Sequence, residues 1–209
     1  LVPDKYGHST ISSLYLDTPD FRIIRASIEA KEQGHAYKEK LRLRTYGTPT
    51  DGTKVFLEIK KKYKGVVYKR RVALTLAEAM DYINGGAKPP DSQIMREIDY
   101  SMCFYSHPKP AAVVSYERDA FFVRDLPALR ITFDSAVRYR NTDLDLTHGS
   151  HGKKLLEDSF FLMEIKTDGA MPLWLSHALD ELNIYPVSFS KYGRAYIDII
   201  NEKRKNNNE

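Results

Sequence analysis

Charged and apolar side chains alternate in three short segments of this chain. Residues 41–44 read LRLR, residues 57–60 read LEIK and residues 163–166 read MEIK. Because successive side chains of a β-strand point to opposite faces of the sheet, each segment predicts a strand with one apolar and one charged face. Mixed acid and base recur on several strands, and the apolar faces need covering. We therefore expect a barrel with a charged lumen and with helices over its apolar outer wall.

The rest of the chain predicts an α+β fold dominated by antiparallel strands. Helices and strands do not repeat as β-α-β-α units, which argues against a doubly wound parallel sheet. We expect instead a closed or nearly closed antiparallel sheet. The expected strands are residues 12–17, 37–46, 54–63, 66–74, 111–118, 120–124, 129–134, 136–140 and 159–167. The expected helices are residues 20–32 with Asp20 as N-cap, 75–83 with a Thr75–Glu78 capping box, one that begins at Asp91, 172–182 and 189–202.

The chain has 209 residues, of which 42% are hydrophobic, and this fits a single domain. We assign residues 1–202 to that domain and expect residues 203–209 to form a disordered tail. The one cysteine, Cys103, excludes an internal disulfide framework and indicates a reducing compartment, hence a cytoplasmic location. We expect Cys103 to be buried as a small hydrophobe. A membrane-protein partner or tether outside this chain stays an open alternative.

The modest net charge of +4 hides a basic region between residues 38 and 71. A concentrated basic field favours a polyanionic ligand such as nucleic acid, anionic lipid or polyphosphate. An exposed sheet face with cross-strand Glu–Lys pairs would show the same alternation, and the pattern alone supports both interpretations equally. Like charges on neighbouring strands repel unless a ligand bridges them, which favours the lumen. No aromatic pair sits between basic residues on a strand, so we expect no nucleic acid.

The charged faces supply the candidate site residues. Arginine forks and lysine ammonium groups bind phosphates, whereas carboxylates among them are costly unless a divalent metal bridges carboxylate and phosphate oxygens. On residues 66–74 Lys69 and Arg71 share one face and Arg70 the other, and the pattern does not decide which face is inside. The remaining candidates for inward-facing charges are Arg42, Arg44, Glu58, Lys60, Arg118, Arg130, Glu164 and Lys166.

Eight motifs, in sequence order, resemble the vacuolar transporter chaperone (VTC) domain. Each motif is weak alone, but the ordered set is specific and covers about residues 12–196. The motifs are LYLDT at 14–18, LRLRTYG at 41–47, FLEIK at 56–60, KRR at 69–71, YER at 116–118, LRITFD at 129–134, MEIK at 163–166 and SFSKY at 188–192.

The resemblance implies more than the spacing does. The family belongs to the triphosphate tunnel metalloenzymes, which are relatives of the CYTH domains, and its fold is an antiparallel barrel with a tunnel lined by Lys, Arg and Glu. Its catalytic members form inorganic polyphosphate from ATP with Mn²⁺, and relatives hydrolyse triphosphates or cyclise ATP. The implied cofactor is therefore Mn²⁺ or Mg²⁺, and the implied ligands are ATP, polyphosphate and tripolyphosphate.

The resemblance also implies roles for residues by their positions in the motifs. Glu164 matches the metal-binding glutamate, and Ser190 with Lys191 matches a Ser-Lys pair near the tunnel end. The residues implied in catalysis are Arg42, Arg44, Lys60, Arg118, Arg130 and Lys191. The residues implied in substrate binding are Lys69, Arg70, Lys166, Ser190 and Glu58.

This chain departs from the family at its start. Family members carry an additional charged strand before the LYLDT strand, whereas residues 1–7 here read as a loop, so we expect that strand to lie outside this chain and the barrel to be open. The leading hypothesis is a metal-dependent polyphosphate polymerase. A tripolyphosphate or nucleoside-triphosphate hydrolase and a non-catalytic polyphosphate-binding module remain the alternatives, since all three need the same lining.

Overall fold

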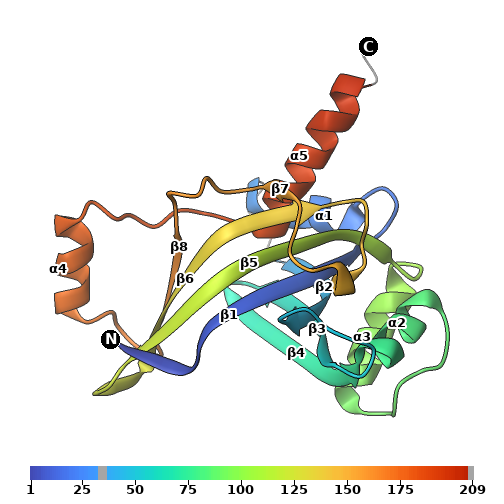
Figure 1. Ribbon diagram of the computed structural model, residues 1–209, viewed down its shortest axis with the longest axis horizontal. Helices are drawn as coiled ribbons and strands as arrows, with labels where there is room; N and C mark the ends of the chain where they lie inside the picture. Colours follow the sequence, from blue (N-terminus) through green and yellow to red (C-terminus); the bar gives the residue numbers. More distant parts are fainter. Residues whose placement is uncertain (33–36, 207–209) are drawn as a thin grey trace.

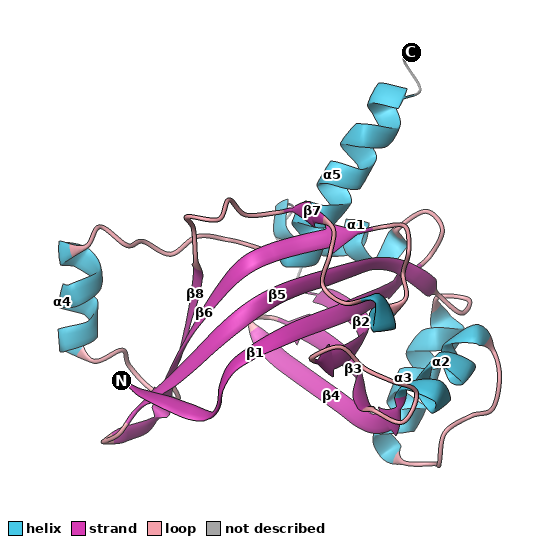
Figure 2. Ribbon diagram, viewed as in Figure 1, coloured by secondary structure: helices cyan, strands magenta, loops and turns pink. Residues whose placement is uncertain are grey.

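The computed structural model describes residues 1–32 and 37–206, and in this part of the chain one antiparallel sheet forms the centre of the molecule (Figures 1 and 2). Its strands follow the order β4-β3-β2-β1-β5-β6-β7, and β8 also pairs with β6. The strands are β1 (Val2–Asp17), β2 (Tyr37–Tyr46), β3 (Lys54–Tyr63), β4 (Val66–Thr75), β5 (Lys109–Val123), β6 (Leu126–Arg140), β7 (Lys153–Lys154) and β8 (Leu162–Lys166). The helices are α1 (Arg22–Glu32), α2 (Leu76–Asn84), α3 (Gln93–Phe104), the 3₁₀ turn η1 (Leu146–His148), α4 (Leu173–Glu181) and α5 (Lys191–Asn206).

The sheet curves strongly but does not close. Figure 1 shows β1, β5 and β6 side by side, with β3 and β4 crossing beneath them at a steep angle. Within the described residues, β4 pairs with β3 alone, and β7 and β8 each pair with β6 alone, so β4 forms one open edge and β7 with β8 the other. The expected α+β fold with an antiparallel barrel is therefore confirmed, as an open barrel.

Three strands are longer than the sequence predicts. Residues 2–7 belong to β1 and are not a loop, because Val2 and Pro3 pair with the far end of β5. The turn-forming residues Pro3 and Gly7 hide this strand in the sequence. β5 and β6 are each one strand where two were predicted. The predicted break in β6 coincides with a β-bulge, at which Ala136 has a φ of 47° and the side-chain alternation is interrupted.

Local capping interactions fix where the helices begin. The capping box of α2 is confirmed, since Thr75 and Glu78 each bind the other's backbone N–H. The prediction that Asp20 caps α1 is wrong, because the Asp17 carboxylate accepts the N–H groups of Ile23 and Ile24 instead. Asp17 reaches these groups from the end of β1, which joins the strand directly to the helix. Similarly, α3 is capped by the Ser92 hydroxyl rather than by Asp91.

The C-terminal helix is longer than expected. α5 continues to Asn206, so residues 203–206 are helical and not a disordered tail, while 207–209 lie outside the described residues. Figure 1 shows α5 projecting from the body of the fold. No helix in the described ranges is long and apolar enough to cross a membrane.

Helices cover both faces of the sheet. Leu14 and Leu16 point from β1 into a core shared with α2 and α3, whereas Tyr15, between them, points into a second core with α1 and α5. The first core is the expected apolar outer wall. The second shares its face of the sheet with the charged residues, so α1 and α5 close part of the inner side.

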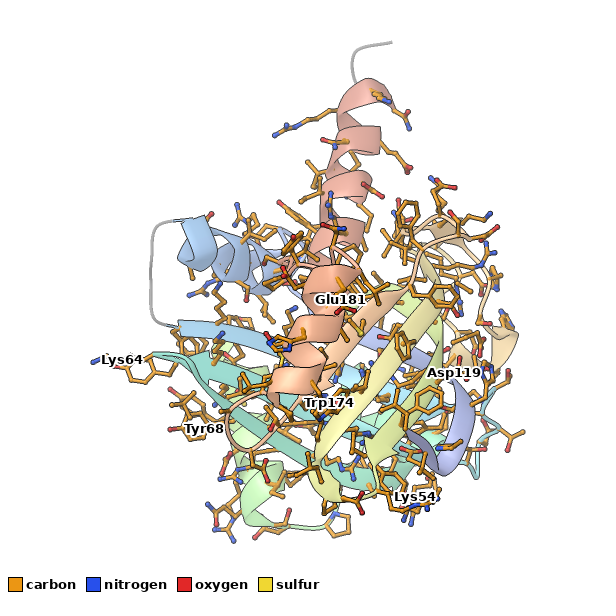
Figure 3. All side chains as sticks on the ribbon, turned by 90° about the vertical axis from the view of Figure 1, so that its left-hand side faces the viewer. Lys54, Lys64, Tyr68, Asp119, Trp174 and Glu181 are labelled. Atoms are coloured by element: carbon orange, nitrogen blue, oxygen red, sulfur yellow. The ribbon has the colours of Figure 1, made fainter. Side chains whose placement is uncertain are left out.

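Two apolar residues are at the surface, and for Cys103 this contradicts the expectation of burial. Cys103 is exposed on α3, because its neighbour Met102 takes the buried position of that helical turn. Trp174 is half-exposed on α4, which packs on β6 mainly through Leu175 (Figure 3).

Candidate functional site

The inner face of the sheet and the start of α5 enclose a basic groove of about 210 Å³. Eight of its lining residues are Lys or Arg, and one is a carboxylate, Glu164. So many cations around one acid give a strongly positive potential, which selects a multiply charged anion. The groove is lined by Tyr15, Lys40, Arg42, Arg44, Lys60, Lys69, Tyr116, Arg118, Glu164, Lys166, Phe189, Ser190 and Lys191.

A buried carboxylate holds the cations of β2 and β4 in place. Arg42 donates through Nε and Nη2 to Oε2 of Glu58, at 2.9 and 2.8 Å, and Lys69 Nζ lies 2.9 Å from Oε1. Glu58 is fully buried beneath the groove. Burial raises the pKa of its carboxyl, but the charges of Arg42 and Arg44 outweigh this, and the net pKa is lowered. Glu58 therefore acts as an ionised anchor under the groove and does not line it.

A second buried carboxylate, Asp134 on β6, anchors the opposite side. Arg118 donates to its two oxygens at 2.6 and 2.8 Å, and Lys191, the first residue of α5, donates to Oδ2 at 2.6 Å. Asp134 has no exposed surface. A guanidinium that donates through two of its three nitrogens to one carboxylate has little rotational freedom. Arg118 and Lys191 are therefore held in position before any ligand arrives.

Glu164, on β8, is the carboxylate that faces the groove. It lies 3.3 Å from Lys166 Nζ and 3.7 Å from Arg118 Nη2, and 38% of its side chain is exposed. Burial raises the pKa of this carboxyl, but Lys166, Lys191 and Arg118 lower it further than burial raises it. Glu164 is thus ionised and accessible, which distinguishes it from Glu58 and Asp134.

The start of α5 closes one side of the groove. Ser190 Oγ accepts the N–H of Gly193 and also a hydrogen bond from Lys40 Nζ, at 2.8 Å. A Cβ on residue 193 would lie 3.1 Å from this oxygen, so glycine lets the serine cap approach closely. The free N–H groups and dipole of a helix N-terminus favour an anion, and they add to the cations here.

Three predicted site residues lie outside this lining: Glu58, which is buried beneath it, Arg70 and Arg130. Arg70 points to the outer side of β4, where its Nε lies 3.6 Å from a Glu97 oxygen on α3. Arg130 is on the inner face of β6 but further along the strand, where it contacts Asp4 at 2.5 Å. The structure therefore brings Lys69, not Arg70, to the groove, and Arg130 is held by the start of β1.

A family model describing the VTC domain matches residues 2–199. The chain belongs to the VTC domain family. This confirms the resemblance that the eight motifs carry. A comparison with curated proteins gave no significant match.

A solved structure shares the fold of this VTC domain. It is the crystal structure of a Bacillus halodurans protein named as a candidate adenylate cyclase, with a TM-score of 0.52 and 15% sequence identity. The match covers 89% of this chain and 81% of that protein. At this identity the likeness concerns the fold alone.

The VTC domain has no self-sufficient metal site among its described residues. Within residues 1–32 and 37–206, no group of three or more His, Cys, Asp and Glu side chains could hold a metal ion. The accessible carboxylate of Glu164 nevertheless fits an ion such as Mg²⁺ or Mn²⁺ that binds one carboxylate together with substrate phosphates. The donor set fits a metal that arrives with its phosphate ligand.

Four residues that line the groove of the VTC domain, and the buried anchor Asp134, were not predicted as site residues; the four are Tyr15, Lys40, Tyr116 and Phe189. Asp134 could have been found, because Arg130, Thr132 and Asp134 alternate on one face of β6. Lys40 continues the alternation of Arg42 and Arg44 toward the start of β2 and is equally visible in the sequence. Tyr15 gives no such signal, since a tyrosine in a strand is ordinarily a core residue.

Tyr15 is expected to make anion binding in the groove of the VTC domain dependent on pH. Burial opposes ionisation of the phenol, but the charges of Arg42, Lys40 and Arg44 overcome this and lower its pKa to about 8. Above that pH a phenolate repels the ligand. Between pH 7 and pH 9 we expect tripolyphosphate affinity to fall by up to about tenfold through this ionisation.

Titration calorimetry at pH 7, 8 and 9 on the wild type and on Tyr15→Phe checks this expectation. Titration of the ligand is common to both proteins, so the difference between their pH profiles reports the phenol together with its effect on the neighbouring Lys40. A Tyr15→Phe profile identical to that of the wild type would show that Tyr15 does not ionise in this range.

Proposed function

We propose that this VTC domain transfers the γ-phosphoryl group of ATP to the end of a growing inorganic polyphosphate chain. The observation that carries the proposal is the basic groove, in which eight cations surround the single ionised carboxylate of Glu164. Family membership supports a tunnel enzyme that acts on triphosphates or polyphosphate. The polymerase reaction is more specific than family membership alone and is our inference.

The chemistry needs positioning and charge more than covalent help from the protein. An oxygen at the end of the chain forms a bond to the γ-phosphorus, the bond from that phosphorus to the β-γ bridging oxygen breaks, and ADP leaves with the electron pair. Arg42, Lys69, Arg118 and Lys191 would neutralise charge on the phosphoryl oxygens. Because buried Glu58 and Asp134 already fix these cations, little reorganisation is required during the reaction.

Glu164 is the residue that would hold Mn²⁺ or Mg²⁺, together with phosphate oxygens. When bound, the ion supplies further neutralisation of phosphate charge, as a Lewis acid. Lys166 is 3.3 Å from the same carboxylate and can turn toward the ligand when the carboxylate is taken up by an ion. The cytosolic location expected from the lone cysteine stays a prediction.

Product analysis after incubation of the protein with ATP and Mn²⁺ tests the proposal. We expect ADP and phosphate polymer in the same reaction, resolved by gel electrophoresis and by ³¹P NMR. Orthophosphate without polymer would replace the proposal by a hydrolase. Tight tripolyphosphate binding without any turnover would leave a binding module, and competition by DNA or RNA as strong as by polyphosphate would indicate a nucleic-acid ligand.

A further inference from the structure

A second pocket adjoins the basic groove where α1, β2 and α5 meet. This side pocket has a volume of about 320 Å³, within the range of small-ligand sites. It shares Lys40, Phe189 and Ser190 with the groove, so the two spaces are contiguous at the first turn of α5. Figure 1 shows α1 and the base of α5 side by side above the sheet. The side pocket is lined by Ile24, Ser27, Ile28, Lys38, Lys40, Ser188, Phe189, Ser190, Gly193, Arg194 and Ile197.

The polar lining of the side pocket is selective for anions. Lys38, Lys40 and Arg194 contribute positive charge, and none of the described residues that line it is acidic. The guanidinium of Arg194 lies 5.7 Å from the centre of the Phe189 ring, which supports it at the pocket wall. The positive charge of this lining therefore favours an anionic ligand.

The cations of the side pocket continue those of the groove. Arg44, Arg42, Lys40 and Lys38 occupy alternate positions of β2 and therefore share its inner face, at a spacing of about 6.6 Å for each pair of residues. Lys60 lies opposite Lys40 on β3. The inner face of β2 thus forms a continuous basic track that leaves the groove past Ser190.

Lys40 lies at the junction of the two spaces. Its ammonium donates to Ser190 Oγ at 2.8 Å, so the Ser190 hydroxyl and the Lys40 charge lie side by side in the wall of both spaces. Burial lowers the pKa of Lys40, and the neighbouring charges of Lys60, Arg42 and Lys191 lower it further. An anion that bridges the groove and the side pocket would relieve this repulsion at Lys40.

We propose that the side pocket binds the part of a linear polyphosphate chain that extends beyond the basic groove. The ligand class is a phosphate chain longer than a triphosphate, because a triphosphate seated in the groove would leave the side pocket empty. Lys38 and Arg194 are the residues that sense chain length. This inference rests on the proposed function of the groove and adds a direction to it: the chain passes between α1 and α5.

Calorimetric titration with tripolyphosphate and with a long polyphosphate of defined length tests the proposal. The double variant Lys38→Ala/Arg194→Ala is expected to lower the affinity for the long chain by about tenfold and to leave the affinity for tripolyphosphate within about twofold. Arg204→Ala is the matched control, since Arg204 is an exposed arginine further along α5, outside both pockets. Thermal unfolding confirms that the variants fold, and Arg194→Glu should reduce long-chain binding more than Arg194→Ala.

The outcomes separate this inference from the proposed function. A double variant that keeps the full preference for the long chain, or that loses both ligands equally, would overturn the side-pocket assignment. A wild type that binds tripolyphosphate but gains nothing from a longer chain would overturn it as well, with the groove unaffected. A wild type that binds neither ligand would overturn the proposed function, and the side-pocket assignment with it.

Discussion

Replacement of Glu164 by glutamine is expected to reduce metal-dependent turnover of ATP by about 100-fold or more. Glu164 is the carboxylate of the groove that is both ionised and accessible, whereas Glu58 and Asp134 are buried and occupied by cations. Glutamine keeps the size of the side chain but removes the charge that a divalent metal requires. Polyanion binding should be largely intact or slightly tighter, because the substitution also removes a negative charge from the groove.

Initial rates of ADP release with Mn²⁺ and with Mg²⁺, measured on Glu164→Gln and on the wild type, check this expectation. Glu97→Gln is the matched control, because Glu97 pairs with Arg70 on the outer side of the sheet and should have wild-type turnover. Calorimetry with tripolyphosphate in the absence of metal separates binding from catalysis. Wild-type turnover in Glu164→Gln would remove the metal role from this residue.

The substitution Asp134→Ala is expected to lower the free energy of unfolding by about 3–5 kcal/mol, which is a large part of the stability of a domain. Asp134 has no exposed surface and pairs with Arg118 and Lys191, which are themselves largely buried. Its removal leaves two positive charges close together, with the half-exposed Glu164, 3.7 Å from Arg118, as the nearby carboxylate. Urea unfolding at pH 7 measures the loss, and a decrease below about 1 kcal/mol would show that the pairing contributes little.

A ligand should partly restore the stability that Asp134→Ala loses. The freed guanidinium and ammonium groups can pair with phosphate, so tripolyphosphate should raise the melting temperature of the variant more than that of the wild type. The matched control is Asp20→Ala, which removes an exposed aspartate paired with Arg25 and should leave the stability close to that of the wild type. An equal ligand-induced shift in Asp134→Ala and in the wild type would indicate that the two cations do not reach the ligand.

Local patterns in the sequence were sufficient for much of the fold and part of the groove. The alternation in residues 41–44 and 57–60 correctly predicts β2 and β3, and it puts Arg42, Arg44 and Lys60 on one face. The reason is geometric, since the period of two along a strand relates each side chain to its neighbours without knowledge of the rest of the chain. The capping box at Thr75 is equally local, because donor and acceptor are three residues apart.

Long-range contacts lie beyond such patterns. The sequence could not separate Lys69 from Arg70, because either face of an edge strand can be the inner one. It also missed residues 2–7 as part of β1, because pairing with β5, more than a hundred residues away, holds that segment extended. The bulge in β6 similarly interrupts the alternation of side chains, and from the sequence this interruption predicts the end of a strand.

By itself, the sequence determined the family, the antiparallel α+β class and the excess of cations on the inner faces of the strands, since each of these depends on short motifs and on their order. The tertiary structure alone decided how those charges are used. It paired buried Glu58 and Asp134 with the cations they hold, left Glu164 accessible, and joined Lys40 to Ser190 across 150 residues of sequence. These pairings form between separate elements when the sheet curves. The alternation of side chains within one strand therefore cannot predict them.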